Sequence, residues 1–125
     1  MTGSEWLDRA RRDLDNARLL VEAGGNDAAV SRAYYAAFYA AKAALNCLGH
    51  DPSTHGGVHS AFGRYVLKEG GGSPTAGRAL NRLFDRRTRA DYTTASLTEA
   101  DARDAIDRAR VVVDAVEAWL AGRQG

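Results

Sequence analysis

The spacing of apolar residues predicts helices along almost the whole chain. Near the N-terminus, apolar residues recur at steps of three and four from Leu7 to Val21, which places them on one face of a helix over 5–23. We expect Ser4 to cap this helix, because a serine hydroxyl accepts hydrogen bonds from the free amides of a first turn. Gly24 and Gly25 are expected to end it.

The segment from residue 26 or 27 to residue 48 is apolar around most of its circumference. A helix of this kind is typical of the centre of a bundle, and its many alanines allow neighbouring helices to approach closely. We expect Asn26 or Asp27 to cap it and Gly49 to end it. Its apolar surface is larger than one small bundle easily covers, which favours a homodimer.

Three more helices are predicted, over 58–67, over 74–89 and from Thr98 onward, the last with a capping box formed with Asp101. Residues 50–57 and 91–97 are expected to be loops, and 69–73 a flexible glycine-rich loop. The pattern therefore predicts an all-α fold, an up-and-down bundle of four to five helices. It forms one domain over 1–125 with an ordered core over about 5–121.

Composition narrows the setting in which the domain works. The chain has 125 residues and one cysteine, Cys47, which we expect to be a small buried side chain in a protein of the reducing cytoplasm. No apolar segment reaches the roughly 18 residues that a membrane span needs, and the first residues do not resemble a signal peptide. Because the net charge is only +1, nucleic-acid binding would need a local patch.

One region of the chain is rich enough in arginine to form such a patch. Five arginines fall between residues 78 and 89, and four of them follow steps of four, four and three along one stripe of the predicted helix. Arginine binds phosphate with two parallel hydrogen bonds and stacks on bases. The stripe indicates a phosphate-binding cleft before Tyr92, and the alternative is a solvated helix face. The five are Arg78, Arg82, Arg86, Arg87 and Arg89.

Other polar residues occur in positions that ask for an explanation. Arg32 lies in the most apolar helix and needs an acidic partner, for which we expect Asp85 or Asp91. Together with Tyr35 it would line a groove, although the aromatic residues of this helix are also compatible with simple core packing. His55 and His59 are four residues apart, but a metal site normally needs a third ligand, so we predict no metal and no cofactor.

Several of these segments together resemble the HEPN domain family. They are the Ser31-Arg32-Ala33-Tyr34-Tyr35 block that continues to Leu45, the Thr54-His55-Gly56-Gly57-Val58 segment, and the run from Arg86 to Tyr92. The resemblance covers about residues 5–121 and implies a helical bundle that often dimerises. It also implies a genomic partner, a minimal nucleotidyltransferase that acts as antitoxin to the HEPN toxin. Active members of the family are metal-independent RNases that use an arginine followed, after four to six residues, by a histidine.

This chain departs from that motif, because no histidine follows Arg86 and Arg87 at the required spacing. Asp91 stands near that position, and its low reference pKa makes it a poor proton donor at neutral pH. Whether the chain is an enzyme is therefore left open, with Arg87, Asp91, Tyr92 and His55 as catalytic candidates. The binding candidates are Arg32, Tyr35, Arg82, Arg86, Arg87 and Arg89.

The sequence leaves three functions open. The first is a HEPN protein of a toxin–antitoxin-type module that binds RNA or nucleotide through the arginine-rich helix. The second is a non-catalytic helical module that dimerises or holds a nucleotide. The third is a metal-independent RNase whose histidine comes from residues 50–59.

Overall fold

The computed structural model describes residues 2–70, 74–92 and 96–124, and for residues 89–92 and 124 it describes the backbone only. Every regular element in these ranges is helical, which confirms the predicted all-α fold. The five α-helices are α1 (Gly3–Glu22), α2 (Asn26–Cys47), α3 (His55–Ala61), α4 (Pro74–Tyr92) and α5 (Glu99–Gln124). A π-helical turn, η1 (Phe62–Val66), directly continues α3.

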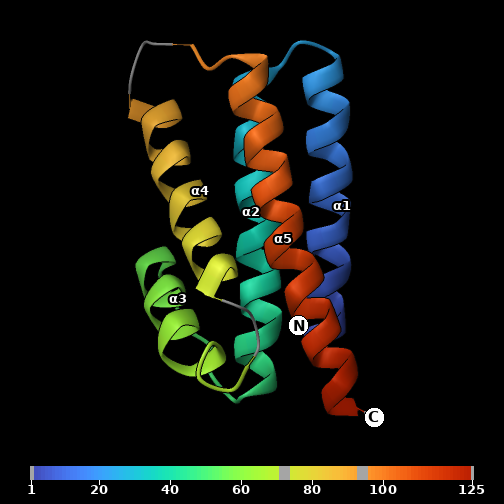
Figure 1. Ribbon diagram of the computed structural model, residues 1–125, viewed down its shortest axis with the longest axis vertical. Coiled ribbons are helices and arrows are strands. Elements are labelled where there is room, and N and C mark those ends of the chain that lie inside the picture. The colour runs from blue at the N-terminus through green and yellow to red at the C-terminus, as the bar shows by residue number, and fades with distance from the viewer. Residues whose placement is uncertain (1, 71–73, 93–95, 125) are drawn as a thin grey trace.

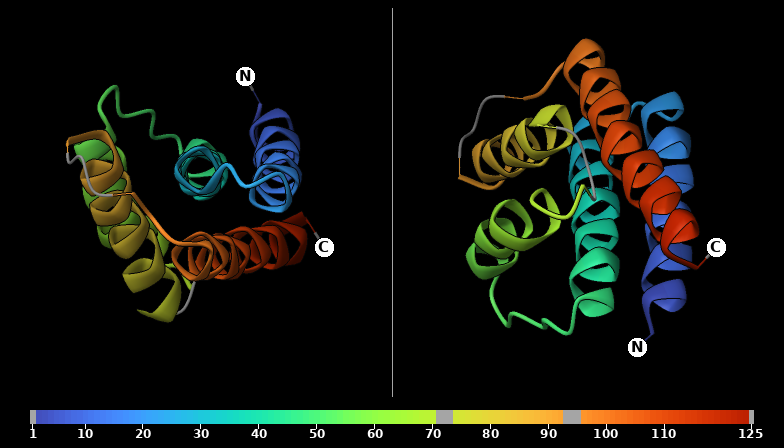
Figure 2. Two further views of the ribbon diagram at one scale, coloured as in Figure 1. Left: turned by 90° about the horizontal axis from the view of Figure 1, so that it is seen from above. Right: turned by 60° about the horizontal axis from the view of Figure 1, so that its bottom comes forward.

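Helix α2 lies at the centre of the bundle. Figure 1 shows α1 on one side of it and α3 and α4 on the other, while α5 crosses in front. The view from above in Figure 2 shows the same arrangement, with α2 enclosed on three sides. The all-round apolar character of this helix is therefore explained by contacts with α1, α4 and α5 of the same chain.

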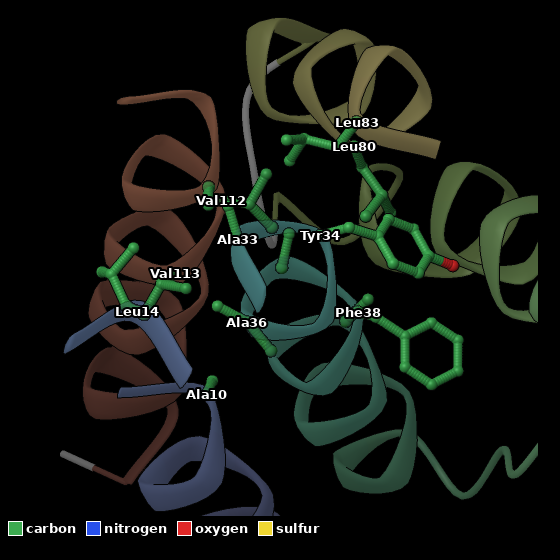
Figure 3. Packing of buried hydrophobic residues seen from close by; sticks show 14 of the residues in the cluster. Ala10, Leu14, Ala33, Tyr34, Ala36, Phe38, Leu80, Leu83, Val112 and Val113 are labelled. Atoms are coloured by element: carbon green, nitrogen blue, oxygen red, sulfur yellow. The ribbon is translucent and has the colours of Figure 1, made fainter. Parts of the chain in front are cut away.

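The core is built on the small residues of α2. Eight of its alanines are fully buried. Figure 3 shows two of them, Ala33 and Ala36, among larger side chains of the surrounding helices, such as Leu14 of α1, Leu80 of α4 and Val112 of α5. Overfilling such a core typically costs about 1–3 kcal/mol, so these positions require alanine-sized residues. The eight are Ala29, Ala33, Ala36, Ala37, Ala40, Ala41, Ala43 and Ala44. Because α2 is covered within the chain, its apolar surface gives no argument for a dimer.

The helix ends differ in part from the predicted ones. Thr2, and not Ser4, caps α1 in a reciprocal box with Glu5, because the helix starts earlier than expected. Asn26 and Asp27 do not cap α2. Their side chains bind the backbone of Leu97 instead, at 3.3 Å from the Asn26 amide to the carbonyl and 3.0 Å from the Leu97 amide to the Asp27 carboxylate. The predicted box of Thr98 with Asp101 at the start of α5 is confirmed.

Two helices extend beyond their predicted bounds. Helix α3 begins at His55 because the Thr54 hydroxyl accepts from the Gly57 amide at 2.9 Å, which allows the helix to start before the glycines. The expected loop over 50–57 is thus partly helical, and α4 likewise continues to Tyr92. Of the expected flexible loop over 69–73, residues 71–73 lie outside the described residues.

Cys47 is exposed, contrary to our expectation, because it lines an open cavity of about 480 Å³ between the ends of α1 and α5. None of the helices within the described ranges combines the length and the apolar composition that a bilayer crossing requires.

Arg86 joins α4 to α5. Its guanidinium donates to the Asp101 carbonyl at 2.8 Å and pairs with the Asp104 carboxylate at 3.0 Å, and its side chain is 19% exposed. Asp104 in turn binds Arg108 at 2.8 Å. Arg86 is therefore held by a network of opposite charges between two helices.

We expect Arg86→Ala to lower the free energy of unfolding by about 1–3 kcal/mol, because it leaves partly buried acceptors without their donor. The matched control is Arg82→Ala on the exposed part of the same helix, which should change stability by no more than about 0.5 kcal/mol. Urea unfolding followed by circular dichroism measures both. Equal effects of the two substitutions would contradict this assignment.

Candidate functional site

A buried tyrosine hydroxyl stands at the centre of the candidate site. Tyr34 of α2 is fully buried, and Figure 3 shows its ring directed away from the alanine core, toward α3. Its hydroxyl lies 2.7 Å from Nδ1 of His55 and 3.2 Å from Nε2 of His59. Because a buried hydroxyl needs hydrogen-bond partners, these contacts fix α3 against α2.

The early start of α3 makes this arrangement possible. With His55 in the first turn, the two histidines are one helical turn apart and reach the same hydroxyl. The His55 ring also stacks on Phe38 with 4.4 Å between ring centroids, while Phe84 of α4 lies 4.7 Å from the His59 ring. Both histidines are thus held by aromatic side chains from two other helices.

Two arginines from different helices flank the neighbouring tyrosine. Cζ of Arg87 lies 5.2 Å from the ring centroid of Tyr35 and 5.3 Å from that of Tyr34, and Cζ of Arg32 lies 4.8 Å from the Tyr35 ring. Such cation–π contacts hold a guanidinium in a defined place. We call Tyr34, Tyr35, His55, His59 and Arg87 the tyrosine–histidine cluster.

Half-exposed rings continue from Tyr35 along the surface toward α1. Tyr39 lies 5.8 Å from Tyr35, and Trp6 stacks on Tyr39 at 5.3 Å. Arg9 lies over the Tyr39 ring and Lys42 over the Trp6 ring. Aromatic rings and cations therefore alternate on the face that leads to the cluster.

The electrostatics of the cluster favour the neutral forms of Tyr34, His55 and His59. Burial raises the pKa of Tyr34, so its hydroxyl keeps its hydrogen. Burial lowers the pKa of His55, and the charges of Arg87 and Lys42 lower it further. Burial also lowers the pKa of His59, against the opposing effects of Asn81 and Asp85.

The structure brings some of the predicted site residues together and separates others. Arg32, Tyr35, His55 and Arg87 lie in or beside the cluster. Arg82 and Arg86 instead line a separate cleft of about 200 Å³, together with Asp85 and Asp101. Arg87, which the spacing sets apart from the predicted stripe, thus lies in a different place from Arg82 and Arg86 of that stripe.

Three predicted residues are not tested. The structure gives the backbone of Arg89, Asp91 and Tyr92 in the last turn of α4, but their side chains lie outside the described part of the chain.

The sequence did not point to all the important residues. The acid that pairs with Arg32 is the buried Asp13 of α1, at 3.4 Å. The expected partners were Asp85, which does not form this pair, and Asp91, whose side chain lies outside the described part of the chain. Tyr34 was assigned only to the aromatic core, and His59 only to its spacing from His55. Since these contacts join different helices, no periodicity within one segment reveals them. Among the described residues, no three His, Cys, Asp or Glu side chains lie close enough to share a metal ion.

Comparison with known proteins identifies the family of this chain. Residues 4–119 match the HEPN domain, and the chain belongs to this family. It is 38% identical over 113 residues to a UPF0332 protein of Thermotoga maritima, covering 90% of this chain and 86% of that protein. It is 37% identical over 114 residues to a protein of Methanocaldococcus jannaschii named "Putative toxin MJ0605", covering 91% of this chain and 85% of that one. A second toxin-named protein of that organism is 25% identical over 115 residues, covering 91% of this chain and 78% of that protein.

The lowered pKa of the two histidines predicts that the fold is less stable in mild acid. The unfolded chain binds protons near the ordinary histidine value of 6.5, whereas the folded chain binds them only at lower pH. Stability should therefore fall as the pH drops through about 6.5 and level off below the folded pKa.

The measurement is the difference in free energy of unfolding between pH 7.5 and pH 5.5. In His59→Gln this difference should be smaller than in the unmodified protein, because one of the two histidines is gone. His50→Gln, outside the cluster, controls for the change of residue type. A difference that is unchanged in His59→Gln would refute the expected coupling.

Proposed function

We propose that this HEPN protein is the toxin-type component of a two-gene module and binds RNA at the tyrosine–histidine cluster. The observation that carries the proposal is the position of Arg87, whose guanidinium lies over the rings of Tyr34 and Tyr35 in a cluster that also holds His55. The toxin names of two relatives support the biological setting.

The chemistry of the cluster suits single-stranded RNA. A guanidinium binds phosphate oxygens in pairs and also stacks on unpaired bases, and Arg87 is held beside the partly exposed Tyr35 ring. The row of rings toward Trp6 extends this surface beyond one nucleotide. With a net charge of +1, the chain has little long-range attraction for RNA, so such local contacts must supply the affinity.

The proposal includes two protein partners that follow from the family. One is a minimal nucleotidyltransferase acting as antitoxin, and the other is a second copy of this chain. Expression of the chain alone should arrest growth, and co-expression of the neighbouring gene should relieve the arrest.

RNA binding should depend on Arg87 and not on arginines elsewhere in α4. We expect Arg87→Ala to weaken binding of a single-stranded oligoribonucleotide about tenfold or more, as is usual for a charged hydrogen bond of about 1.5–3 kcal/mol. The slope of log affinity against log salt should decrease by about 0.7 for each phosphate that the variant no longer neutralises. Fluorescence anisotropy at several salt concentrations measures both quantities.

The matched control is Arg78→Ala, an arginine near the start of the same helix, which should leave affinity and salt slope unchanged. Arg87→Lys separates charge from geometry, because lysine keeps the charge but lacks the planar fork. If Arg78→Ala and Arg87→Ala weaken binding equally, the cluster is not the binding site.

A second candidate function is metal-independent RNA cleavage. It is favoured by the proximity of a histidine and an arginine, since Arg87 and His55 both contact Tyr34. In that reaction a histidine nitrogen without hydrogen takes the proton of the ribose 2′-hydroxyl, and an arginine stabilises the charge on the phosphate. Loss of RNA cleavage in His55→Ala, with cleavage retained in His50→Ala, would favour this function. Binding without cleavage would exclude it.

A further inference from the structure

The Tyr34 hydroxyl has one hydrogen but contacts two imidazoles, and this has a chemical consequence. It can donate only to one of them, so the other must donate to the hydroxyl oxygen. Both rings are kept neutral by the surroundings described above, and each therefore carries a single N–H hydrogen. The question is which nitrogen of each ring carries it.

Two arrangements satisfy both contacts. In the first, the hydroxyl donates to Nδ1 of His55 and accepts from Nε2 of His59, so both rings carry their hydrogen on Nε2. In the second, Nδ1 of His55 donates to the hydroxyl, which donates to Nε2 of His59, so both rings carry it on Nδ1. The tautomers of the two histidines are therefore coupled through one hydroxyl.

Two observations favour the first arrangement. The contact with His55 is short, at 2.7 Å, which is typical of an O–H donor, whereas the 3.2 Å contact with His59 suits an N–H donor. In addition, Nδ1 of His59 is buried and has no hydrogen-bond partner. The nearby Asn81 side chain raises the pKa of His59, but it does not reach hydrogen-bond geometry with Nδ1. A bare nitrogen is better tolerated there than a buried N–H group, which would lose its hydrogen bond to water.

We propose that His55 binds a phosphate oxygen of RNA as a hydrogen-bond donor through Nε2, and that Tyr34 and His59 are positioning residues that hold its hydrogen there. This proposal rests on the proposed function for the identity of the ligand. Within the described residues Nε2 of His55 makes no hydrogen bond, and the half-exposed ring lies in the same cluster as Arg87. An N–H group and a guanidinium together offer two donors to one phosphate.

The position of this hydrogen favours RNA binding over RNA cleavage. With its hydrogen on Nε2, His55 has no free electron pair on that nitrogen and does not act there as the base that RNA cleavage needs. Its Nδ1 electron pair is occupied by the Tyr34 hydroxyl. The resting cluster is thus suited to holding a phosphate rather than to removing a proton.

Nitrogen-15 NMR of the histidine side chains tests this directly, because the two tautomers differ in their Nδ1 and Nε2 shifts. At pH 8, His55 of the unmodified protein should carry its hydrogen on Nε2. Tyr34→Phe removes the hydroxyl, so both tautomers of His55 should become populated. The groups that face His55 and could otherwise shift its state are Tyr34, Tyr35, Phe38 and Lys42 of α2, His59 of α3 and Arg87 of α4.

The same variants are then tested for binding to the single-stranded oligoribonucleotide. Tyr34→Phe should weaken binding about three- to tenfold, which corresponds to the removal of one hydrogen bond. Tyr65→Phe removes a tyrosine hydroxyl outside the cluster and should change neither the tautomer nor the affinity. If Tyr34→Phe does not fold, His59→Leu, which removes the donor to the hydroxyl, should also populate both tautomers.

The inference is overturned if His55 carries its hydrogen on Nδ1 in the unmodified protein, or if Tyr34→Phe and His59→Leu fold and keep the Nε2 form unchanged. A different result would show that the proposed function is wrong. In that case the unmodified protein does not bind RNA, and the phosphate role falls while the tautomer result stands.

Discussion

The arrangement of this molecule depends on one buried hydroxyl group. Helix α2 is covered by other helices on most sides, so every polar atom that it carries inward must find a partner within the protein. For Tyr34 that partner comes from α3, whose two histidines share the hydroxyl. The need to satisfy one group thus places a short helix and orients two imidazoles. Arg87 of α4 lies over the ring that carries this hydroxyl.

Adjacent arginines of α4 make different contacts, because neighbouring residues on a helix point about 100° apart. Arg86 is directed toward α5, where acidic side chains and a backbone carbonyl hold it. Arg87 is directed toward α2, where two aromatic rings hold it. The local charge of the segment is therefore divided between a contact that stabilises the bundle and a site suited to binding an anion.

Much of the fold was predictable from the sequence, because helical periodicity and capping residues are local signals. The central position of α2 followed from its apolar character around most of its circumference, and the box of Thr98 with Asp101 followed from spacing alone. The predicted start of α3 was wrong because Gly56 and Gly57 favoured a loop, whereas the Thr54 hydroxyl caps the helix ahead of them.

The site was predictable only in part, since its contacts join residues distant along the chain. Arg32, Tyr35, His55 and Arg87 stood out by residue type. The buried Asp13 that pairs with Arg32 did not, because an aspartate on an amphipathic helix is expected to face water. Nor did the sharing of one hydroxyl by His55 and His59, which requires α2 and α3 to be packed together.

The most direct test of the central claim is to follow the arginine Nε–H resonances while a single-stranded oligoribonucleotide is added. If RNA binds where α2, α3 and α4 meet, the resonances of Arg87 and Arg32 shift with increasing RNA and those of Arg78 and Arg82 stay in place. Shifts confined to Arg78 and Arg82, with Arg87 unmoved at saturation, would contradict the account.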